Sequence, residues 1–207
     1  MTMHLPPPIV YIVDDDQQLR ASLAWLLASI NVKAVGCAGA QEFLELYDPQ
    51  SIACLVLDVR MPQTSGFELQ EMLKQRGIDL PILFVSAHGD IPMAVKALQN
   101  GAIDFIEKPY NPQRMLDRIQ AALKIAAQRQ TVQVHRRQLQ DKLNLLTARE
   151  QEVLRLVVDG KASKAIAHEL QISVKTVDVH RIRIKEKLEV TSIAMLIRDV
   201  IDGGGCR

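Results

Sequence analysis

Short apolar runs alternate with amphipathic helical patterns over about the first 120 residues of the chain. The runs Ile9 to Val13 and Ile52 to Leu57 are continuously apolar, which is typical of strands that a parallel sheet buries on both faces. Leu19, Leu23 and Leu26 recur at helical spacing after the first run. Three more strands are expected at 32–37, 81–85 and 102–106. Strands alternating with helices in this way predict a doubly wound, five-stranded parallel α/β sheet of the flavodoxin-like type.

The second part of the chain has a different pattern. Residues 113 to 159 contain neither Gly nor Pro, so the last helix of the sheet domain is predicted to continue into a helical linker. Four apolar residues repeat there every seven positions: Ile125, Val132, Leu139 and Leu146. The positions between them are mostly polar, which leaves two interpretations open, a coiled coil and a solvated connecting helix. Beyond Leu145 the apolar pattern is helical only and predicts an all-α four-helix domain.

Charge and composition narrow the classes of protein that fit. The formal net charge is +1, but residues 1–125 carry 10 basic against 14 acidic residues, and residues 126–207 carry 15 against 10. The basic part is therefore the candidate for binding a polyanion. No apolar run approaches the ~18 residues of a membrane span. Cys37, Cys54 and Cys206 lack disulfide or zinc spacing, and the N-terminal segment lacks a secretion signal, so we expect a cytoplasmic protein that binds no membrane.

Polar side chains follow the predicted strands. Asp14 to Asp16 come directly after the first strand and Asp58 after the third, with Ser86 at the end of the fourth and Lys108 just past the fifth. Singly, such an Asp often only caps a helix, and Ser86 and Lys108 would be surface residues. Because strand ends of a parallel sheet meet at one edge, the joint placement predicts a carboxylate cluster that suits Mg²⁺. With a hydroxyl and an ammonium it also suits phosphoryl transfer to a carboxylate.

Residues 9–120 resemble the receiver domain of two-component response regulators in the segments IVDDD, LDVRMPQTSG, FVSAHGD and IEKPY. The resemblance implies that Asp58 accepts a phosphoryl group from a sensor histidine kinase. It also implies that Asp15, Asp58 and the backbone carbonyl of Arg60 hold Mg²⁺, and that Asp14 acts through a water molecule. A haloacid-dehalogenase-like phosphatase would need an Asp at position 60 as its acid and base, and that position holds Arg60.

The same resemblance assigns roles near the phosphoryl group. Ser86 and Lys108 would bind its oxygens, and Phe105 would be the aromatic side chain whose rotamer follows Ser86. The segment HGDIPMAVKALQNGAIDFIEKPY makes the match close to the FixJ subfamily of the FixJ/NarL family. Arg60 and His88 stand two residues beyond the phospho-acceptor and Ser86. We hypothesise that they govern hydrolysis of the acyl phosphate, and the alternative is that both point into solvent.

Residues 145–202 resemble the LuxR-type helix-turn-helix in the segments LTAREQEVLRLVVDG, KAIAHEL and ISVKTVDVHRIRIKEKL. Two short helices at a tight turn, the second one basic, are what insertion into the major groove requires. The chain departs from the family at Ala162 and Ser163, where Ser-Asn is usual. On a helix over 173–188, one face is predicted to pack inward: Val177, His180, Ile184 and Leu188. The candidate DNA contacts are Lys175, Thr176, Asp178, Val179, Arg181, Ile182, Arg183 and Lys185.

These candidates are expected to divide between bases and phosphates. Val179 and Ile182 suit thymine methyls, and Asp178 can accept a hydrogen bond from cytosine N4. The alternative for Asp178 is a carboxylate placed near a helix N-terminus. Arg181 and Lys185 are expected to contact phosphates of the DNA backbone or to form solvated ion pairs. By resemblance, a last helix at 191–201 supplies a dimer contact.

The prediction is a receiver domain at 1–123, a helical linker at 124–144 and a LuxR-type helix-turn-helix domain at 145–207. Such a chain is a phosphorylation-dependent transcriptional regulator that binds double-stranded promoter DNA and forms a homodimer on phosphorylation. It is expected not to be an enzyme, beyond catalysing its own Mg²⁺-dependent phosphorylation and dephosphorylation. Two switches are compatible with this architecture: the unphosphorylated receiver masks the DNA-binding helix, or it fails to dimerise.

Overall fold

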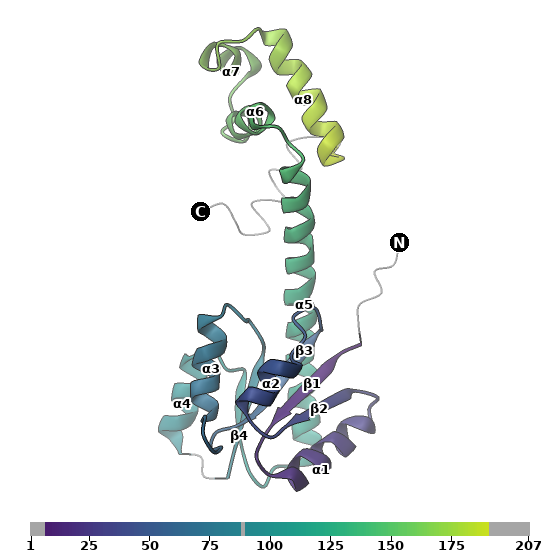
Figure 1. Ribbon diagram of the computed structural model, residues 1–207, viewed down its shortest axis with the longest axis vertical. Coiled ribbons are helices and arrows are strands. Elements are labelled where there is room, and N and C mark those ends of the chain that lie inside the picture. The colour runs from purple at the N-terminus through teal and green to yellow at the C-terminus, as the bar shows by residue number, and fades with distance from the viewer. Residues whose placement is uncertain (1–6, 88–89, 191–207) are drawn as a thin grey trace. The chain divides into compact units, whose positions relative to one another are not determined.

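The computed structural model describes residues 7–87 and 90–190 and divides the chain into two units, Met1–Gln130 and Thr131–Arg207 (Figure 1). The first unit holds a parallel sheet whose strands are β1 (Ile9–Val13), β2 (Lys33–Cys37), β3 (Ala53–Asp58), β4 (Ile82–Ser86) and β5 (Asp104–Glu107). Its helices are α1 (Gln17–Ala28), α2 (Ala40–Leu46), α3 (Gly66–Gln75), α4 (Ile91–Gln99) and the first part of α5 (Pro112–Asn144). The second unit contains α6 (Ala148–Val158), α7 (Ser163–Glu169) and α8 (Val174–Leu188). The predicted α/β sheet domain followed by a helical domain is confirmed.

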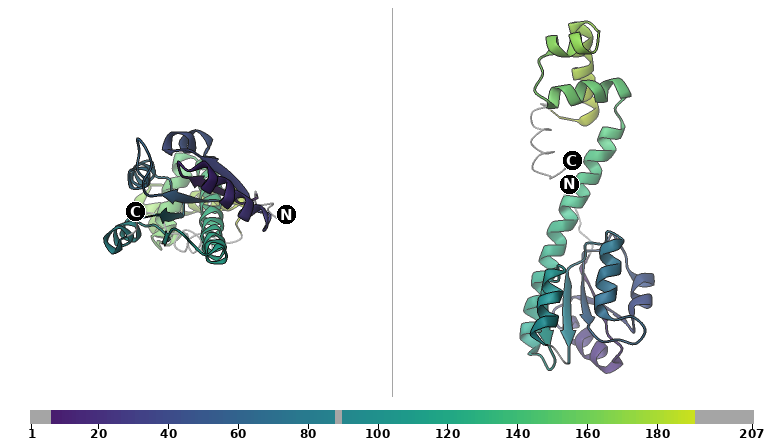
Figure 2. Two further views of the ribbon diagram at one scale, coloured as in Figure 1. Left: turned by 90° about the horizontal axis from the view of Figure 1, so that it is seen from below. Right: turned by 90° about the vertical axis from the view of Figure 1, so that its left-hand side faces the viewer.

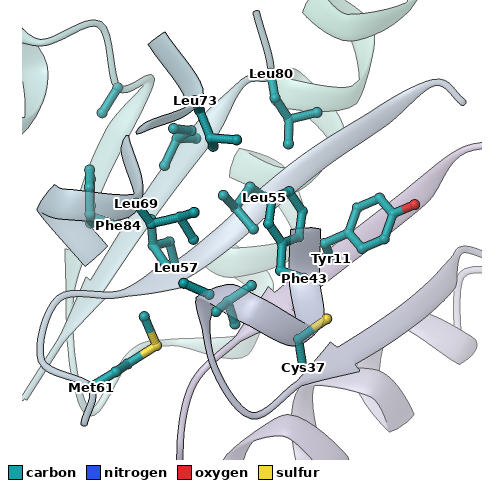
Figure 3. Close-up of a cluster of buried hydrophobic side chains, with 14 of the residues drawn as sticks. Tyr11, Cys37, Phe43, Leu55, Leu57, Met61, Leu69, Leu73, Leu80 and Phe84 are labelled. Carbon is teal, nitrogen blue, oxygen red and sulfur yellow. The ribbon is translucent and has the colours of Figure 1, made fainter. Parts of the chain in front are cut away.

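The sheet separates two hydrophobic cores. Successive side chains of a strand point to opposite faces, so Tyr11 and Val13 lie in one core and Val10 and Ile12 in the other. Residues of α2, α3 and α4 cover the first core, which Figure 3 shows in close-up. Residues of α1 and α5 cover the second core. The right-hand view of Figure 2 shows the strands between α5 and α3. Burial on both faces explains why these strands read as continuous apolar runs.

Strand order reverses at β1, because the sheet runs β2-β1-β3-β4-β5. Parallel α/β sheets bind ligands at such a point, outside the carboxyl ends of the strands. Val13 pairs with Leu57 across β1 and β3. Asp14 follows Val13 and Asp58 follows Leu57, so the two aspartates lie at the carboxyl ends of neighbouring strands. Ser86 ends β4 at the same edge of the sheet.

Helix α3 begins unusually close to the end of β3. Ser65 caps the helix by accepting from the backbone N–H of Glu68, whose carboxylate accepts from the Ser65 N–H in return. The next residue, Gly66, donates its N–H to the Val59 carbonyl at 3.0 Å. A Cβ on Gly66 would lie 2.2 Å from the backbone oxygen of Asp58. Only glycine fits there without displacing the chain around Asp58.

Helix α5 is continuous through the predicted linker. Of the four residues that repeat every seven positions, Leu146 is buried in the core of the second unit and Leu139 packs against that core. Val132 is 55% exposed. Leu139 and Leu146 thus serve the core of their own chain, and the coiled coil and the solvated connecting helix both remain predictions for the linker.

In the second unit, Val177, Ile184 and Leu188 form the inner face of α8, as their spacing predicts. His180 is half-buried, and its Nδ1 is buried without a hydrogen-bond partner among the described residues. The helix predicted at 191–201, His88 and Cys206 lie outside the described residues. In the part of the chain that is described, no helix has the length and apolar character needed to cross a membrane.

Candidate functional site

Three charged side chains meet at the carboxyl edge of the sheet. The Nζ atom of Lys108 lies 2.7 Å from Oδ2 of Asp14 and 2.7 Å from Oδ1 of Asp58. Asp14 and Asp58 are only 3% and 7% exposed. Buried carboxylates are costly unless they are paired and hydrogen-bonded, so one ammonium group that bridges both is what allows them to lie side by side.

The backbone holds the second oxygen of each carboxylate. Oδ1 of Asp14 accepts from the Asp16 N–H at 2.9 Å, and Oδ2 of Asp58 accepts from the Arg60 N–H at 2.7 Å. The guanidinium of Arg20 donates to the Asp14 carbonyl at 2.6 Å and so tethers the loop after β1 to α1. The carboxylates are thus oriented before any ligand arrives, which is the condition for electrostatic catalysis.

Burial and charge act against each other on the ionisation of this cluster. Burial raises the pKa of Asp58, and the hydrogen bond and charge of Lys108 only partly offset it. For Lys108, burial alone would lower the pKa, but the hydrogen bonds from its ammonium to Asp14 and Asp58 outweigh it and the pKa is raised. Lys108 therefore stays protonated at neutral pH and is available to pair with an anion.

The remaining predicted residues lie around this cluster. Ser86 is buried at the end of β4, and its carbonyl accepts from the Lys108 N–H at 2.8 Å. Phe105 is half-buried in β5, with its ring centroid 6.4 Å from that of Phe84. Asp15 and the side chain of Arg60 are exposed. The structure thus brings the side chains of Asp14, Asp58 and Lys108 into direct contact, and the other predicted residues line the same edge of the sheet.

The donor set suits a hard cation. Among the described residues no three acidic, His or Cys side chains converge as a ready-made metal cage. Mg²⁺ does not need one, because it usually binds one or two carboxylates and completes its shell with water and other oxygens. The Asp14 and Asp58 carboxylates, bridged by Lys108, supply oxygens of that kind at one edge of the sheet.

The second candidate surface is α8 with the preceding α7. Ser173 caps α8 through the Thr176 N–H at 3.0 Å, and the two hydroxyls lie 2.7 Å apart. Thr176 and Arg181 are half-buried, and the other six DNA-contact candidates are exposed: Lys175, Asp178, Val179, Ile182, Arg183 and Lys185. Asp178 accepts a hydrogen bond from the Ser163 hydroxyl of α7 at 3.0 Å. Its carboxylate therefore already has a partner within the protein.

A buried ion pair fixes α8 to α6. Glu150 is 2% exposed and lies 2.7 Å from the Lys187 ammonium. The hydrogen bond from Lys187 lowers the pKa of Glu150 to about 2, and the Thr147 N–H and hydroxyl add to the shift. The sequence pattern does not indicate this ion pair. It does indicate the place of Glu150, because Thr147 followed by Glu150 has the spacing of a capping box at the start of α6.

Comparison with known proteins covers both units. The family model for the response regulator receiver domain matches residues 10–120, and the model for bacterial regulatory proteins of the luxR family matches residues 144–200. The response regulator protein TodT of Pseudomonas putida is 43% identical over 190 residues, which are 92% of this chain and 84% of TodT. The transcriptional regulatory protein FixJ of Bradyrhizobium diazoefficiens is 34% identical over 195 residues, 94% of this chain and 95% of FixJ.

Solved structures give the same result. The structure of the response regulator StyR matches with a TM-score of 0.83 and 44% identity, covering 95% of this chain and 99% of StyR. Full-length FixJ from B. japonicum matches with a TM-score of 0.57 and 33% identity, covering 98% of this chain and all of that one.

Fold, site and comparisons together define a phosphorylation-dependent, DNA-binding regulator of transcription and not a classical enzyme. The chain belongs to the response regulators of two-component systems, in which a receiver domain is joined to a LuxR-type helix-turn-helix domain. The resemblance found in the sequence is confirmed.

Proposed function

We propose that Asp58 is the phospho-acceptor and that a sensor histidine kinase is the donor. A carboxylate oxygen of Asp58 attacks the phosphorus of a phosphohistidine, the P–N bond breaks, the imidazole leaves, and an aspartyl acyl phosphate forms. The observation that carries this proposal is the Lys108 bridge, because it places one cation 2.7 Å from Asp58 at the carboxyl edge of the sheet. In this proposal the Lys108 ammonium offsets the cost of burying two carboxylates and is in place to bind a phosphoryl oxygen.

The other pocket residues have supporting roles in this proposal. Lys108 and Ser86 bind oxygens of the transferred phosphoryl group, and Phe105 changes rotamer with Ser86. Asp15, Asp58 and the Arg60 carbonyl would hold Mg²⁺, and Asp14 would act through water. The ion, when bound, neutralises charge on the phosphoryl oxygens during transfer. The receiver then catalyses its own phosphorylation and dephosphorylation.

The output side of the proposal concerns α8. We assign α8 as the recognition helix, with its exposed basic residues at phosphates and its exposed apolar residues at base edges. Phosphorylation of the receiver, at 1–123, promotes a homodimer, and the linker at 124–144 joins it to the DNA-binding domain at 145–207. Two recognition helices one DNA turn apart would read a palindrome with half-sites about 10 base pairs between centres. Because its proposed partner is promoter DNA, we propose that the protein acts in the cytoplasm.

Selection of DNA by the full-length protein tests this function. The protein is incubated with a pool of random double-stranded DNA, with Mg²⁺ and either with or without acetyl phosphate as a small phosphodonor. We expect an imperfect palindrome to be enriched only after treatment with the donor. Enrichment of single, unpaired half-sites would contradict the dimer, and equal enrichment without the donor would contradict control by phosphorylation.

A further inference from the structure

Ser163, the first residue of α7, connects this helix to two charged side chains of α8. Its hydroxyl donates to Oδ1 of Asp178 at 3.0 Å and accepts from Nη1 of Arg181 at 3.3 Å. Asp178 and Arg181 are three residues apart, so they lie on one face of α8. One hydroxyl therefore holds an anion and a cation of the same helix face.

The contact at Ser163 is a direct link between side chains of the two helices. The N-cap residue of α7 is Ala162, whose side chain cannot accept a hydrogen bond from the first turn, and the hydroxyl of the next residue, Ser163, is used by α8. Of the two interpretations of Asp178 drawn from the sequence, this contact favours the one in which the carboxylate does not read a base.

The network also restricts Arg181. A guanidinium has five N–H donors, and the bond to Ser163 uses only one of them. The side chain is half-buried, so fewer rotamers are open to it than to the exposed Arg183. A guanidinium that is fixed at one end and free at the other is well suited to a phosphate oxygen, because little entropy is lost on binding.

We infer that Ser163 is a positioning residue for DNA binding, which holds Asp178 and Arg181 as one unit and aims Arg181 at the phosphate backbone. In this arrangement Asp178 orients its neighbours and does not read a base. Base reading is left to Val179 and Ile182, which are 40% and 56% exposed. The inference rests on the proposed role of α8 as the recognition helix.

The test measures the affinity of full-length variants for two duplexes, one carrying the sequence enriched in the selection above and one of unrelated sequence. Ser163→Ala should weaken binding to both by roughly three- to tenfold and reduce the slope of log K against log salt concentration by about 1, and Arg181→Ala should do the same. Ser163→Thr keeps the hydroxyl and should restore both values. The double variant Ser163→Ala/Arg181→Ala should bind as Arg181→Ala alone does.

Lys175→Ala is the matched control, since Lys175 is an exposed cation of α8 outside this network. The effect of Lys175→Ala should add to that of Ser163→Ala.

Asp178→Asn serves as a second, nearly isosteric variant, and its thermal unfolding is measured alongside. Three results would overturn the inference: additive effects of Ser163→Ala and Arg181→Ala, unaltered binding by Ser163→Ala, or a change of preference at one operator position in Asp178→Asn. If the wild type enriches no sequence, the proposed function fails, but the salt slope on unrelated DNA still tests Ser163.

Discussion

The Nζ atom of Lys108 lies 2.7 Å from Oδ1 of Asp58, and the other carboxylate oxygen, Oδ2, accepts a hydrogen bond from the Arg60 N–H. Before phosphorylation, therefore, both oxygens of the proposed nucleophile are hydrogen-bonded. Transfer of a phosphoryl group would replace the carboxylate oxygen at Lys108 with a phosphoryl oxygen. In the proposed mechanism the resting and phosphorylated states would differ in the partner of one lysine, which directly follows β5, the strand that carries Phe105.

Lys108→Met tests the neutralising role of that lysine. The substitution keeps an aliphatic side chain but leaves Asp14 and Asp58 buried without their shared cation. We expect a loss of about 3 kcal/mol in the free energy of unfolding at pH 7, measured by urea denaturation. The loss should shrink as the pH falls, because burial raises the pKa of Asp58 and its protonation relieves the repulsion between the two carboxylates. Lys33→Met, at an exposed position of β2, should be nearly neutral, and an equal loss there would contradict the explanation.

Gly66→Ala tests the close approach of α3 to β3. The new Cβ would lie 2.2 Å from the Asp58 carbonyl oxygen and 3.0 Å from the Phe84 ring, so the chain next to Asp58 must shift. We expect a cost of about 2–4 kcal/mol in the free energy of unfolding and slower phosphorylation by acetyl phosphate. Gly39→Ala is the control, because a Cβ there meets nothing within 4 Å and the backbone is extended. If both variants are equally stable, the contact at Gly66 is not limiting.

The ion pair between Glu150 and Lys187 predicts a pH dependence of the second unit. Because folding lowers the pKa of Glu150 from 4.5 to about 2, its contribution is complete above pH 4.5 and is lost as the pH falls towards 2. The Lys187 side chain is 35% exposed, so we expect about 2 kcal/mol and not the full value of the shift. Glu150→Gln should lower the free energy of unfolding by that amount at pH 7 and flatten its dependence on pH in this range. Glu152→Gln, two residues further along α6 and exposed, is the comparison.

Val179 and Ile182 should recognise thymine methyl groups. Val179→Ala and Ile182→Ala are each expected to weaken binding to the selected duplex by about 1 kcal/mol, with little effect on unrelated DNA. Replacing the contacted thymine with uracil removes only the methyl group, so it should weaken the wild type and have no further effect on the corresponding Ala variant. Lys185→Ala should instead weaken all duplexes alike. Equal sensitivity of wild type and variant to uracil would exclude the methyl contact.

Much of the fold could be predicted because local signals and global packing agree. The buried strands are continuous apolar runs, and Asp90 caps α4 through the Met93 N–H, which is the usual contact of an Asp directly before a helix. The fifth strand begins at Asp104 and not at 102, because the Ala102 N–H is used to close the end of α4 on the Ala97 carbonyl. Such a backbone hydrogen bond cannot be predicted from the pattern of apolar residues.

The site was predictable as a set of strand ends, but its contacts were not. That Lys108 bridges two carboxylates depends on the register of β1, β3 and β5 and on a side-chain rotamer, neither of which the sequence pattern specifies. The link between Ser163 and Asp178 joins residues 15 positions apart on two helices. It depends on how α7 packs on α8, and the sequence offered only the unusual Ala162 as a hint.

The most direct test of the central claim is the phosphorylation of Asp58→Asn. The full-length wild type, Asp58→Asn and the control Asp117→Asn, at an exposed position of α5, are incubated with acetyl phosphate and Mg²⁺ and their intact masses are measured. We predict one acid-labile phosphoryl group on the wild type and on Asp117→Asn, and none on Asp58→Asn, whose thermal unfolding should show that it remains folded. An acid-labile phosphoryl group on folded Asp58→Asn, in the same yield as on the wild type, would contradict the account.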